Sequence, residues 1–391
     1  MSESWTGRRL ELEVGSVAHG GHCVSRVDGR VVFVRHALPG ELVVAEVTED
    51  KGKSFCRADA VRVLRPSPDR VEPPCPSAGP GLCGGCDWQH ATPEAARVLK
   101  ADVVVEQLER LAGITWPVTV EELRPAPLRW RTRTRFVAGA GGKAGLRAHH
   151  SHRVIPLADC PITMTEAAGA VLSRTWRRGS EIEVTEDGAG RVHLRQDTRQ
   201  LKGGVAKERA AGRSWRLSSH GFWQGHPAAA DALAEVVGEW AAVSPGGRAW
   251  DLYAGVGIFA SVLAGQVGED GSVLAVESGR RAVADGEANL ADLPQVGWRC
   301  GRVEHVLSTL DEQVEVVVLD PPRKGAGKQV VDAIAAAGAH RVVYVACDPA
   351  ALARDVATFA NHGYSLRELR AFDAFPMTHH IECVALLSRA G

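Results

Sequence analysis

The stretch RVVYVACDPAALARD, residues 341–355, decides the fold of the C-terminal half of the chain. Its apolar run over residues 342–346 predicts a buried strand, and a Cys-Asp-Pro turn then opens a helix at about residues 350–356. This order places Cys347 at the carboxyl end of a strand, the edge of an open α/β sheet where substrates bind. An isolated free cysteine is most often a small buried hydrophobe, so a reactive Cys347 has to be argued from its neighbours.

Helical stretches alternate with short β runs from about residue 228 onward. This alternation predicts an α/β domain with a doubly wound parallel sheet flanked by helices. Its β runs are RAWDLY, SVLAVE, VEVVVLD, RVVYVAC and ECVALLS.

Two regions with different residue patterns precede this α/β domain. Residues 8–65 hold short β runs broken by Gly-Gly, Asp-Gly and Pro-Gly pairs, which predicts a small five-stranded barrel. Residues 66–90 are rich in Pro, Gly and Cys, a helix follows over about 93–112, and residues 124–215 are typical of a mixed, mostly β region. The expected domains are therefore residues 1–65, 66–215 and 216–391.

Charge and hydropathy limit the classes of protein to consider. The 46 Lys or Arg nearly cancel the 47 Asp or Glu, so net charge alone implies no nucleic-acid partner. No apolar run approaches the roughly 18 residues of a membrane span, and the first residues, MSESWTGRRLELEV, lack an apolar signal core. We therefore expect a cytoplasmic protein with no membrane partner. In a reducing cytosol, clustered thiols among its nine cysteines point to metal or catalysis more than to disulfides.

Four cysteines form the first candidate site. Cys83 and Cys86 flank two glycines, Cys75 lies eight residues upstream of Cys83, and Cys160 follows much later. Four thiolates suit either tetrahedral zinc or a [4Fe-4S] cluster. A zinc ribbon would more often supply a second Cys-x-x-Cys, whereas Cys160 stands alone before a proline, so the spacing slightly favours iron–sulfur.

A second candidate site is a cofactor pocket at another strand–turn–helix unit. Its strand runs into DLYAGVG, in which Asp251 precedes a turn with Gly255 and Gly257. Glu277 ends the next strand, 20 residues beyond Gly257, where a carboxylate can accept both ribose hydroxyls. The third glycine of the dinucleotide fingerprint is missing from the sequence, so these residues favour S-adenosylmethionine over NAD.

The run VVVLDPPRKGAG supplies a third candidate site. Asp320 ends an apolar strand, and the two prolines force the loop out over the sheet rim, where Arg323 and Lys324 add positive charge. Such a rigid, polar rim is suited to holding a planar base beside a cofactor.

A basic stretch forms the fourth candidate site. Residues 124–158 hold eight Lys or Arg and no Asp or Glu. Alternation would place four arginines on one face of a strand, spaced to follow phosphates, so this region is expected to bind RNA. These are Arg129, Arg131, Arg133 and Arg135.

The sequence resembles the S-adenosylmethionine-dependent RNA 5-methyluridine methyltransferases in the runs CGGCDWQH, FWQG, DLYAGVGIF, LDPPRKGAG, VACDPAALARD and FPMTHHIE. Residues 8–65 are also similar to the TRAM domain, an OB-like RNA-binding barrel, so the resemblance covers nearly the whole chain. It implies a Rossmann-like class I methyltransferase domain, preceded by a TRAM barrel and by a central mixed α+β domain that carries a four-Cys cluster.

The resemblance also implies a role for each candidate residue. Cys347 matches the nucleophile that adds to carbon 6 of uracil, and Glu382 matches the base that removes the carbon 5 proton. Iron–sulfur is now favoured over zinc, because the four cysteines match cluster ligands. The matched cofactor-binding positions are Gln224, Tyr253, Glu277 and Asp320, and the matched ligands are Cys75, Cys83, Cys86 and Cys160.

Some positions depart from the family pattern. Seven residues separate Cys75 from Cys83, where the family leads us to expect about five. His226 and Ile258 stand where the family often has Asn. Asp348 replaces the Asn of a Cys-Asn-Pro turn, and its carboxylate would tend to raise the pKa of the neighbouring thiol.

We therefore predict an enzyme that methylates carbon 5 of an unpaired or flipped-out uridine and acts as a monomer. Ribosomal RNA is the favoured substrate and transfer RNA the alternative. Two other classes stay open here: a non-catalytic RNA-binding or assembly factor, and an NAD-dependent oxidoreductase with a zinc site. The joint presence of Cys347, Glu382 and Asp320 argues against the first of these.

Overall fold

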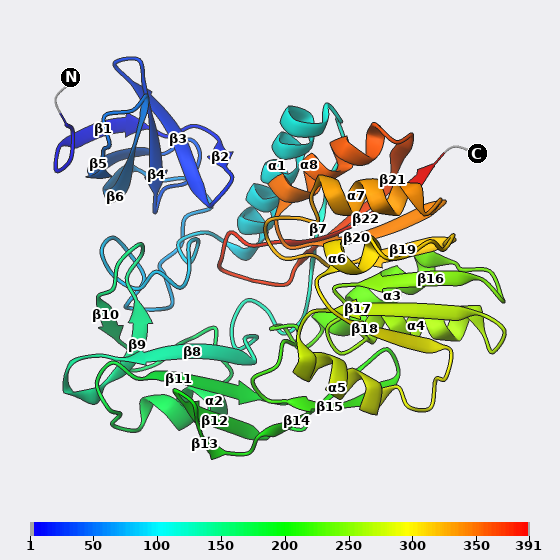
Figure 1. The fold of residues 1–391 in the computed structure, drawn as a ribbon. Coiled ribbons are helices and arrows are strands. Elements are labelled where there is room, and N and C mark those ends of the chain that lie inside the picture. The colour runs from blue at the N-terminus through cyan, green and yellow to red at the C-terminus, as the bar shows by residue number, and fades with distance from the viewer. Residues whose placement is uncertain (1–3, 390–391) are drawn as a thin grey trace.

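A computed structural model describes residues 4–389, which form an N-terminal barrel-like sheet, a central β region and a C-terminal α/β domain (Figure 1). The N-terminal strands, in blue, lie beside helix α1 (Pro93–Ala112), and the central strands, in green, lie below them. Within these residues no helix is both long and apolar enough to cross a membrane.

The N-terminal part is one sheet of six strands in the order β1-β5-β6-β4-β3-β2. The sheet holds the five expected strands and one more, the two-residue strand β2 at its edge. Side chains alternate between buried and partly exposed along β5, so one face fills a core, which Trp88 and Leu99 complete from outside the sheet. The strands are β1 (Arg9–Glu13), β2 (Val17–Ala18), β3 (His22–Val27), β4 (Arg30–Arg35), β5 (Leu42–Glu49) and β6 (Phe55–Arg65).

The central part is a second six-stranded sheet, in the order β10-β9-β8-β11-β12-β13, followed by a separate hairpin. Helix α2 (Thr165–Leu172) covers it and buries Val171 against its core. The sheet strands are β8 (Arg133–Ala138), β9 (Ala144–Arg147), β10 (Val154–Pro156), β11 (Glu181–Glu186), β12 (Val192–Gln196) and β13 (Arg199–Lys202), with a 3₁₀ turn at Ala140–Gly142; the hairpin is β14 (Val205–Ala210) and β15 (Arg213–Ser218).

The C-terminal sheet has eight strands in the order β18-β17-β16-β19-β20-β22-β21-β7. Strands β16 to β20 are parallel, β22 runs antiparallel to both of its neighbours, and the strand order reverses between β16 and β19. A ligand site is expected at this reversal, beyond the carboxyl ends of the strands. The strands are β7 (Val120–Glu122), β16 (Arg248–Leu252), β17 (Ser272–Glu277), β18 (Val296–Cys300), β19 (Val316–Leu319), β20 (Arg341–Ala346), β21 (Tyr364–Asp373) and β22 (Glu382–Arg389).

Helices cover both faces of this sheet. One core holds apolar side chains of α3 and α4, and the other holds those of α6, α7 and α8. Helix α1 and strand β7 come from the 66–215 stretch but pack on the C-terminal sheet, where α1 lies beside α8 (Figure 1). The helices are α3 (Ala229–Ala241), α4 (Ile258–Val267), α5 (Arg280–Asn289), α6 (Val303–Leu307), α7 (Lys328–Ala336) and α8 (Pro349–Ala360).

Candidate active site

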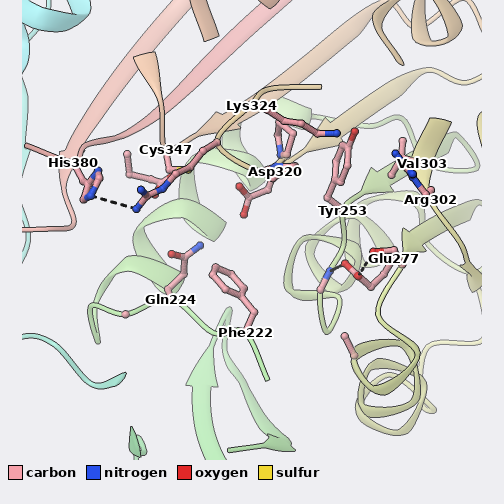
Figure 2. Close-up of a pocket in the computed structure, with 18 of the residues that line it drawn as sticks. Phe222, Gln224, Tyr253, Glu277, Arg302, Val303, Asp320, Lys324, Cys347 and His380 are labelled. Carbon is pink, nitrogen blue, oxygen red and sulfur yellow. Dashed lines mark hydrogen bonds between the residues drawn. The ribbon is translucent and has the colours of Figure 1, made fainter. Parts of the chain in front are cut away.

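A cavity of about 650 Å³ lies at the carboxyl ends of β16, β17, β19 and β20, at the reversal of strand order. Figure 2 shows side chains from several of these elements pointing into it. All six residues predicted to act in catalysis or cofactor binding line this cavity: Gln224, Tyr253, Glu277, Asp320, Cys347 and Glu382.

Cys347 is delivered by a local strand–turn–helix unit. Strand β20 is buried over Val342–Ala346, and Pro349 occupies the first turn of α8, where its missing N–H costs no hydrogen bond. Asp348 is the N-cap: its Oδ1 accepts a hydrogen bond of 2.8 Å from the backbone N–H of Ala351. The turn therefore has a fixed conformation that leaves the thiol half-buried at the cavity wall.

Glu382 reaches the cavity from the antiparallel neighbour of β20. The register pairs Ala346 with Cys383, so one step further along the ladder Cys347 and Glu382 stand opposite each other. Glu382 is only 2% exposed. The thiol and the carboxyl group therefore come from two strands that are fixed relative to each other by backbone hydrogen bonds.

Burial and negative neighbours favour the protonated forms of these groups. Burial raises the pKa of the Cys347 thiol to about 12, and the nearby carboxyl groups of Glu382 and Asp320 act in the same direction. Burial, and then Asp320, hold the pKa of Glu382 well above its ordinary value, and burial raises the pKa of Asp320 to about 7. Arg323 opposes these effects at both Cys347 and Glu382.

Two aromatic side chains and a histidine line the cavity without having been singled out in the sequence. Phe222 is 69% exposed at the cavity, which is unusual for a large apolar ring. His380 lies 3.3 Å from Arg323 and edge-on to Phe375. The run FPMTHHIE contains Phe375 and His380, but nothing in its spacing assigns them a role.

The opposite end of the cavity is built by the glycine loop after β16. Gly257 has φ +89°, and a Cβ there would lie 2.9 Å from Leu290, so only glycine fits this turn. The backbone N–H of Gly255 donates to Glu277 (3.1 Å), and that of Gly279 donates to its other oxygen (2.6 Å). The loop thus holds the Glu277 carboxylate at the cavity wall, as a ribose-binding acid requires (Figure 2).

Asp251 lies on β16, just before this loop, and is fully buried. One of its oxygens accepts from the N–H of Ala260 (2.8 Å), and the other has no hydrogen-bond partner among the described residues. Burial raises its pKa to about 8. Asp251 does not line the cavity, so its contact with Ala260 ties β16 to the start of α4 behind the glycine loop.

The departure at His226 falls outside the cavity. Its ring stacks on Trp130 with centroids 5.9 Å apart, and its Nε2 lies 3.0 Å from the carbonyl oxygen of Pro125. Gln224, two residues earlier, does line the cavity. The contacts of His226 therefore hold the segment that carries Gln224. Because His226 itself does not line the cavity, having histidine in place of Asn at this position changes no residue of the cavity wall.

The four predicted ligand cysteines are all free thiols, and the charge of one raises the pKa of another. Burial raises the pKa of Cys75, Cys83 and Cys86, and the charge of Cys160 raises each of them further. Cys83 forms a β-bridge with Ala148, so the 75–90 segment is fastened to the central sheet. Among residues 4–389, no three or more His, Cys, Asp or Glu side chains are arranged to hold a metal ion.

The basic stretch differs from its prediction. Strand β8 begins at Arg133, so Arg129 and Arg131 do not share a strand face with Arg135. Arg129 has φ +55° and an ion pair with Asp159, and Arg131 is partly buried. The predicted row of four arginines on one strand face is therefore wrong, and the two strand arginines also have carboxylate partners. Those pairs are Arg133 with Glu208 and Arg135 with Glu183.

Comparison with known proteins places these features in a family. A tRNA (Uracil-5-)-methyltransferase family model matches residues 302–390, and a TRAM domain model matches residues 3–61. An uncharacterized RNA methyltransferase of Streptomyces coelicolor is 47% identical over 99% of this chain and 94% of its own length. One of Corynebacterium diphtheriae is 35% identical over 98% of this chain and 97% of its own length.

A solved structure shares the whole fold. It is the tRNA (uracil-54, C5)-methyltransferase of Pyrococcus abyssi in complex with S-adenosyl-L-homocysteine, with a TM-score of 0.73 and 19% identity. The match covers 97% of this chain and 100% of that one. Since the relatives named here are RNA methyltransferases, the NAD-dependent oxidoreductase with a zinc site loses its support.

Proposed function

Because this chain belongs to the RNA methyltransferases of the (uracil-5-) type, we propose that it transfers a methyl group from S-adenosylmethionine to carbon 5 of a uridine in RNA. One observation carries this proposal: Cys347, directly after β20, and Glu382, at the start of the neighbouring strand β22, line the same cavity as Glu277. A nucleophile and a proton acceptor on facing strands can act on two adjacent atoms of one planar base.

Cys347 begins the reaction as a thiolate. It adds to carbon 6 of uracil, forming a carbon–sulfur bond and moving the ring electrons towards carbon 5 and the carbonyl oxygen. When bound, S-adenosylmethionine would supply the methyl group from its sulfonium to carbon 5, and S-adenosylhomocysteine would leave. Since burial holds the pKa of Cys347 at about 12, the nearby charge of Arg323 is what favours the reactive form.

Glu382 completes the reaction as the base. It takes the proton from carbon 5, the carbon 5–carbon 6 double bond forms again, and the bond to Cys347 breaks to return the thiolate. The base must be ionised to do this, and burial raises its pKa well above the ordinary value. Arg323 lowers that pKa, so a single cation assists both the addition and the elimination.

The remaining cavity residues bind and orient. Glu277 accepts the ribose hydroxyls of the cofactor, and Tyr253 and Gln224 hold its remaining parts. Asp320 lies between the two ends of the cavity, and its pKa of about 7 allows it to donate a hydrogen bond to a uracil carbonyl when protonated.

The four cysteines are proposed to hold a [4Fe-4S] cluster. Their donor set consists of soft thiolates alone, which suits either iron–sulfur or zinc. The resemblance of the sequence favours iron–sulfur over zinc, because the four cysteines match cluster ligands. The cluster's role is architectural: it would join the loop of Cys83 and Cys86 to Cys160 in the central domain.

We propose ribosomal RNA as the substrate class, because the combination of a TRAM-like barrel and a four-Cys cluster favours ribosomal over transfer RNA. Transfer RNA is the second candidate. It is favoured by the description of the family model matched at residues 302–390. Mapping 5-methyluridine in both RNA classes from a strain lacking the gene decides between them.

Release of tritium from RNA that contains [5-³H]uridine tests the proposed reaction, because only chemistry at carbon 5 expels this hydrogen. We expect release that requires S-adenosylmethionine and that Cys347→Ala abolishes. Cys300→Ser, at an exposed thiol, should release tritium like the wild type. Methylation of RNA without tritium release would contradict the assignment of carbon 5.

A further inference from the structure

The N-terminal barrel touches the turn that carries Cys347. The β2–β3 turn brings His19 to the catalytic domain, where its Nε2 lies 3.0 Å from Oδ2 of Asp348. The two side chains are 37% and 22% exposed, so the contact is half-buried and open on one side to solvent. It joins residues 329 positions apart in the sequence.

This contact is part of a built junction. The indole N–H of Trp88 donates to the carbonyl oxygen of Gly21 (3.2 Å), which fixes the tip of the barrel turn. A Cβ on Gly21 would lie 2.7 Å from Cβ of His379, so glycine allows the close approach. A cavity of about 210 Å³ lies at the junction, and both His19 and Cys347 line it.

Asp348 uses both carboxylate oxygens. Oδ1 accepts from the N–H of Ala351 and caps α8, and Oδ2 faces His19. Burial acts to raise the pKa of Asp348, but the hydrogen bonds from His19 and Ala351 outweigh it, and the pKa lies below its ordinary value. The side chain is therefore a carboxylate next to Cys347, where negative charge raises the pKa of the thiol.

We propose that His19 is a positioning residue for the nucleophile: its Nε2–H donates to the Asp348 carboxylate, which clamps the Cys-Asp-Pro turn and engages the oxygen that would otherwise act on Cys347 unpaired. This inference rests on the proposed function only in taking Cys347 as the nucleophile. This contact also explains how the Asp348 carboxylate is accommodated next to a reactive thiol, because His19 of the N-terminal domain forms a hydrogen bond with it. The other charged or titratable groups near Asp348 and Cys347 are Glu382, Asp320, Arg323, Arg354, His379, His380 and the Cys383 thiol.

Alkylation of Cys347 in the full-length protein tests the proposal without RNA or cofactor. Iodoacetamide reacts with the thiolate, so its rate at pH 8.5, followed by peptide mass spectrometry, reports the thiolate fraction of Cys347. His19→Ala should slow the reaction by on the order of three- to tenfold, as a pKa rise of about half to one unit requires. Asp348→Asn should accelerate it, and the double variant should behave like Asp348→Asn alone.

Two further variants separate this role from a general loss of structure. His19→Gln keeps a hydrogen-bond donor and should recover part of the rate. His362→Ala breaks a His–Asp contact of 2.8 Å, with Asp332, beyond the other end of α8 and should react like the wild type. Alkylation of His19→Ala at or above the wild-type rate would overturn the proposal, because it would mean that removing the imidazole only opens the junction.

The same variants distinguish this inference from the proposed function. With RNA containing 5-fluorouridine and saturating S-adenosylmethionine, His19→Ala should trap RNA more slowly by a similar factor at unchanged RNA affinity. Equal trapping rates in His19→Ala and wild type would also overturn the inference. If even the wild type fails to trap RNA while the alkylation pattern holds, the proposed function fails and the His19–Asp348 coupling stands.

Discussion

The guanidinium of Arg323 and the imidazole of His380 meet at 3.3 Å on the wall of the cavity (Figure 2). The ring of His380 is held in turn by an edge-on contact with Phe375, at 5.9 Å between centroids. This arrangement fixes a cation whose charge lowers the pKa of both Cys347 and Glu382. Nucleophile and base thus depend on the same guanidinium.

Arg323→Gln should lower turnover by about tenfold or more, because the pKa of both reacting groups rises. Since the Cys347 thiol acts as a thiolate and its pKa of about 12 lies above the whole range from pH 6 to pH 9, turnover should rise with pH across this range in both proteins, while the variant stays slower by a similar factor. Initial rates of tritium release between pH 6 and pH 9 measure this. Lys328→Gln serves as the matched control, because this lysine pairs with Asp332 outside the cavity. Turnover of Arg323→Gln equal to that of the wild type across this range would contradict the electrostatic role.

Glu382→Gln should still form the covalent adduct and transfer the methyl group, but release product at least about 100-fold more slowly, the scale of a lost general base. The measurement is the amount of protein–RNA adduct that survives denaturing electrophoresis with ordinary uridine RNA. The exposed Glu368→Gln, on the adjacent strand β21, should turn over normally. Normal turnover in Glu382→Gln would show that another group removes the proton.

Lys100→Met should destabilise the fold by about 3–5 kcal/mol, the cost of leaving one partner of a buried ion pair alone. The ammonium of Lys100 lies 2.6 Å from Oδ1 of Asp373 and donates to the carbonyl oxygen of Phe375. Adding Asp373→Asn should recover part of the loss. Urea unfolding gives the free energies, and Lys328→Met, at an exposed pair, should cost at most about 1 kcal/mol.

The purified protein should be brown and contain about four iron atoms per chain. Dithionite should bleach the visible absorption, and iron removal should expose the 75–90 segment to protease, since the cluster ties this segment to the central domain. Cys83→Ser should lose most of the colour, whereas Cys300→Ser should keep it. A colourless protein with one equivalent of zinc would replace the cluster by a zinc site.

Local units were predictable from the sequence. The strand and helix around Cys347 were expected at 342–346 and about 350–356, and they occur at Arg341–Ala346 and Pro349–Ala360. Apolar runs, a proline at the first helical turn and an N-cap aspartate are local signals, so they specify this unit without tertiary information. The same holds for α1, whose ends match the expected helix.

Contacts between distant segments were not predictable in this way. Strand β7 pairs with β21, and His19 meets Asp348, but neither partner carries a signal for the other in its own neighbourhood. The arginine row was wrong for a related reason: alternating spacing implies one face only inside a strand, and Arg129 and Arg131 precede β8. Carboxylates from other segments then pair with Arg133 and Arg135.

Trapping with 5-fluorouridine RNA tests whether Cys347 is the nucleophile, because fluorine at carbon 5 cannot leave as a proton and the adduct persists. With S-adenosylmethionine present, we predict a stable complex in which peptide mass spectrometry finds the methylated nucleotide attached to Cys347. Cys347→Ala should form no complex while still binding the RNA. A complex that forms in Cys347→Ala, or an adduct found on another residue, would contradict the account.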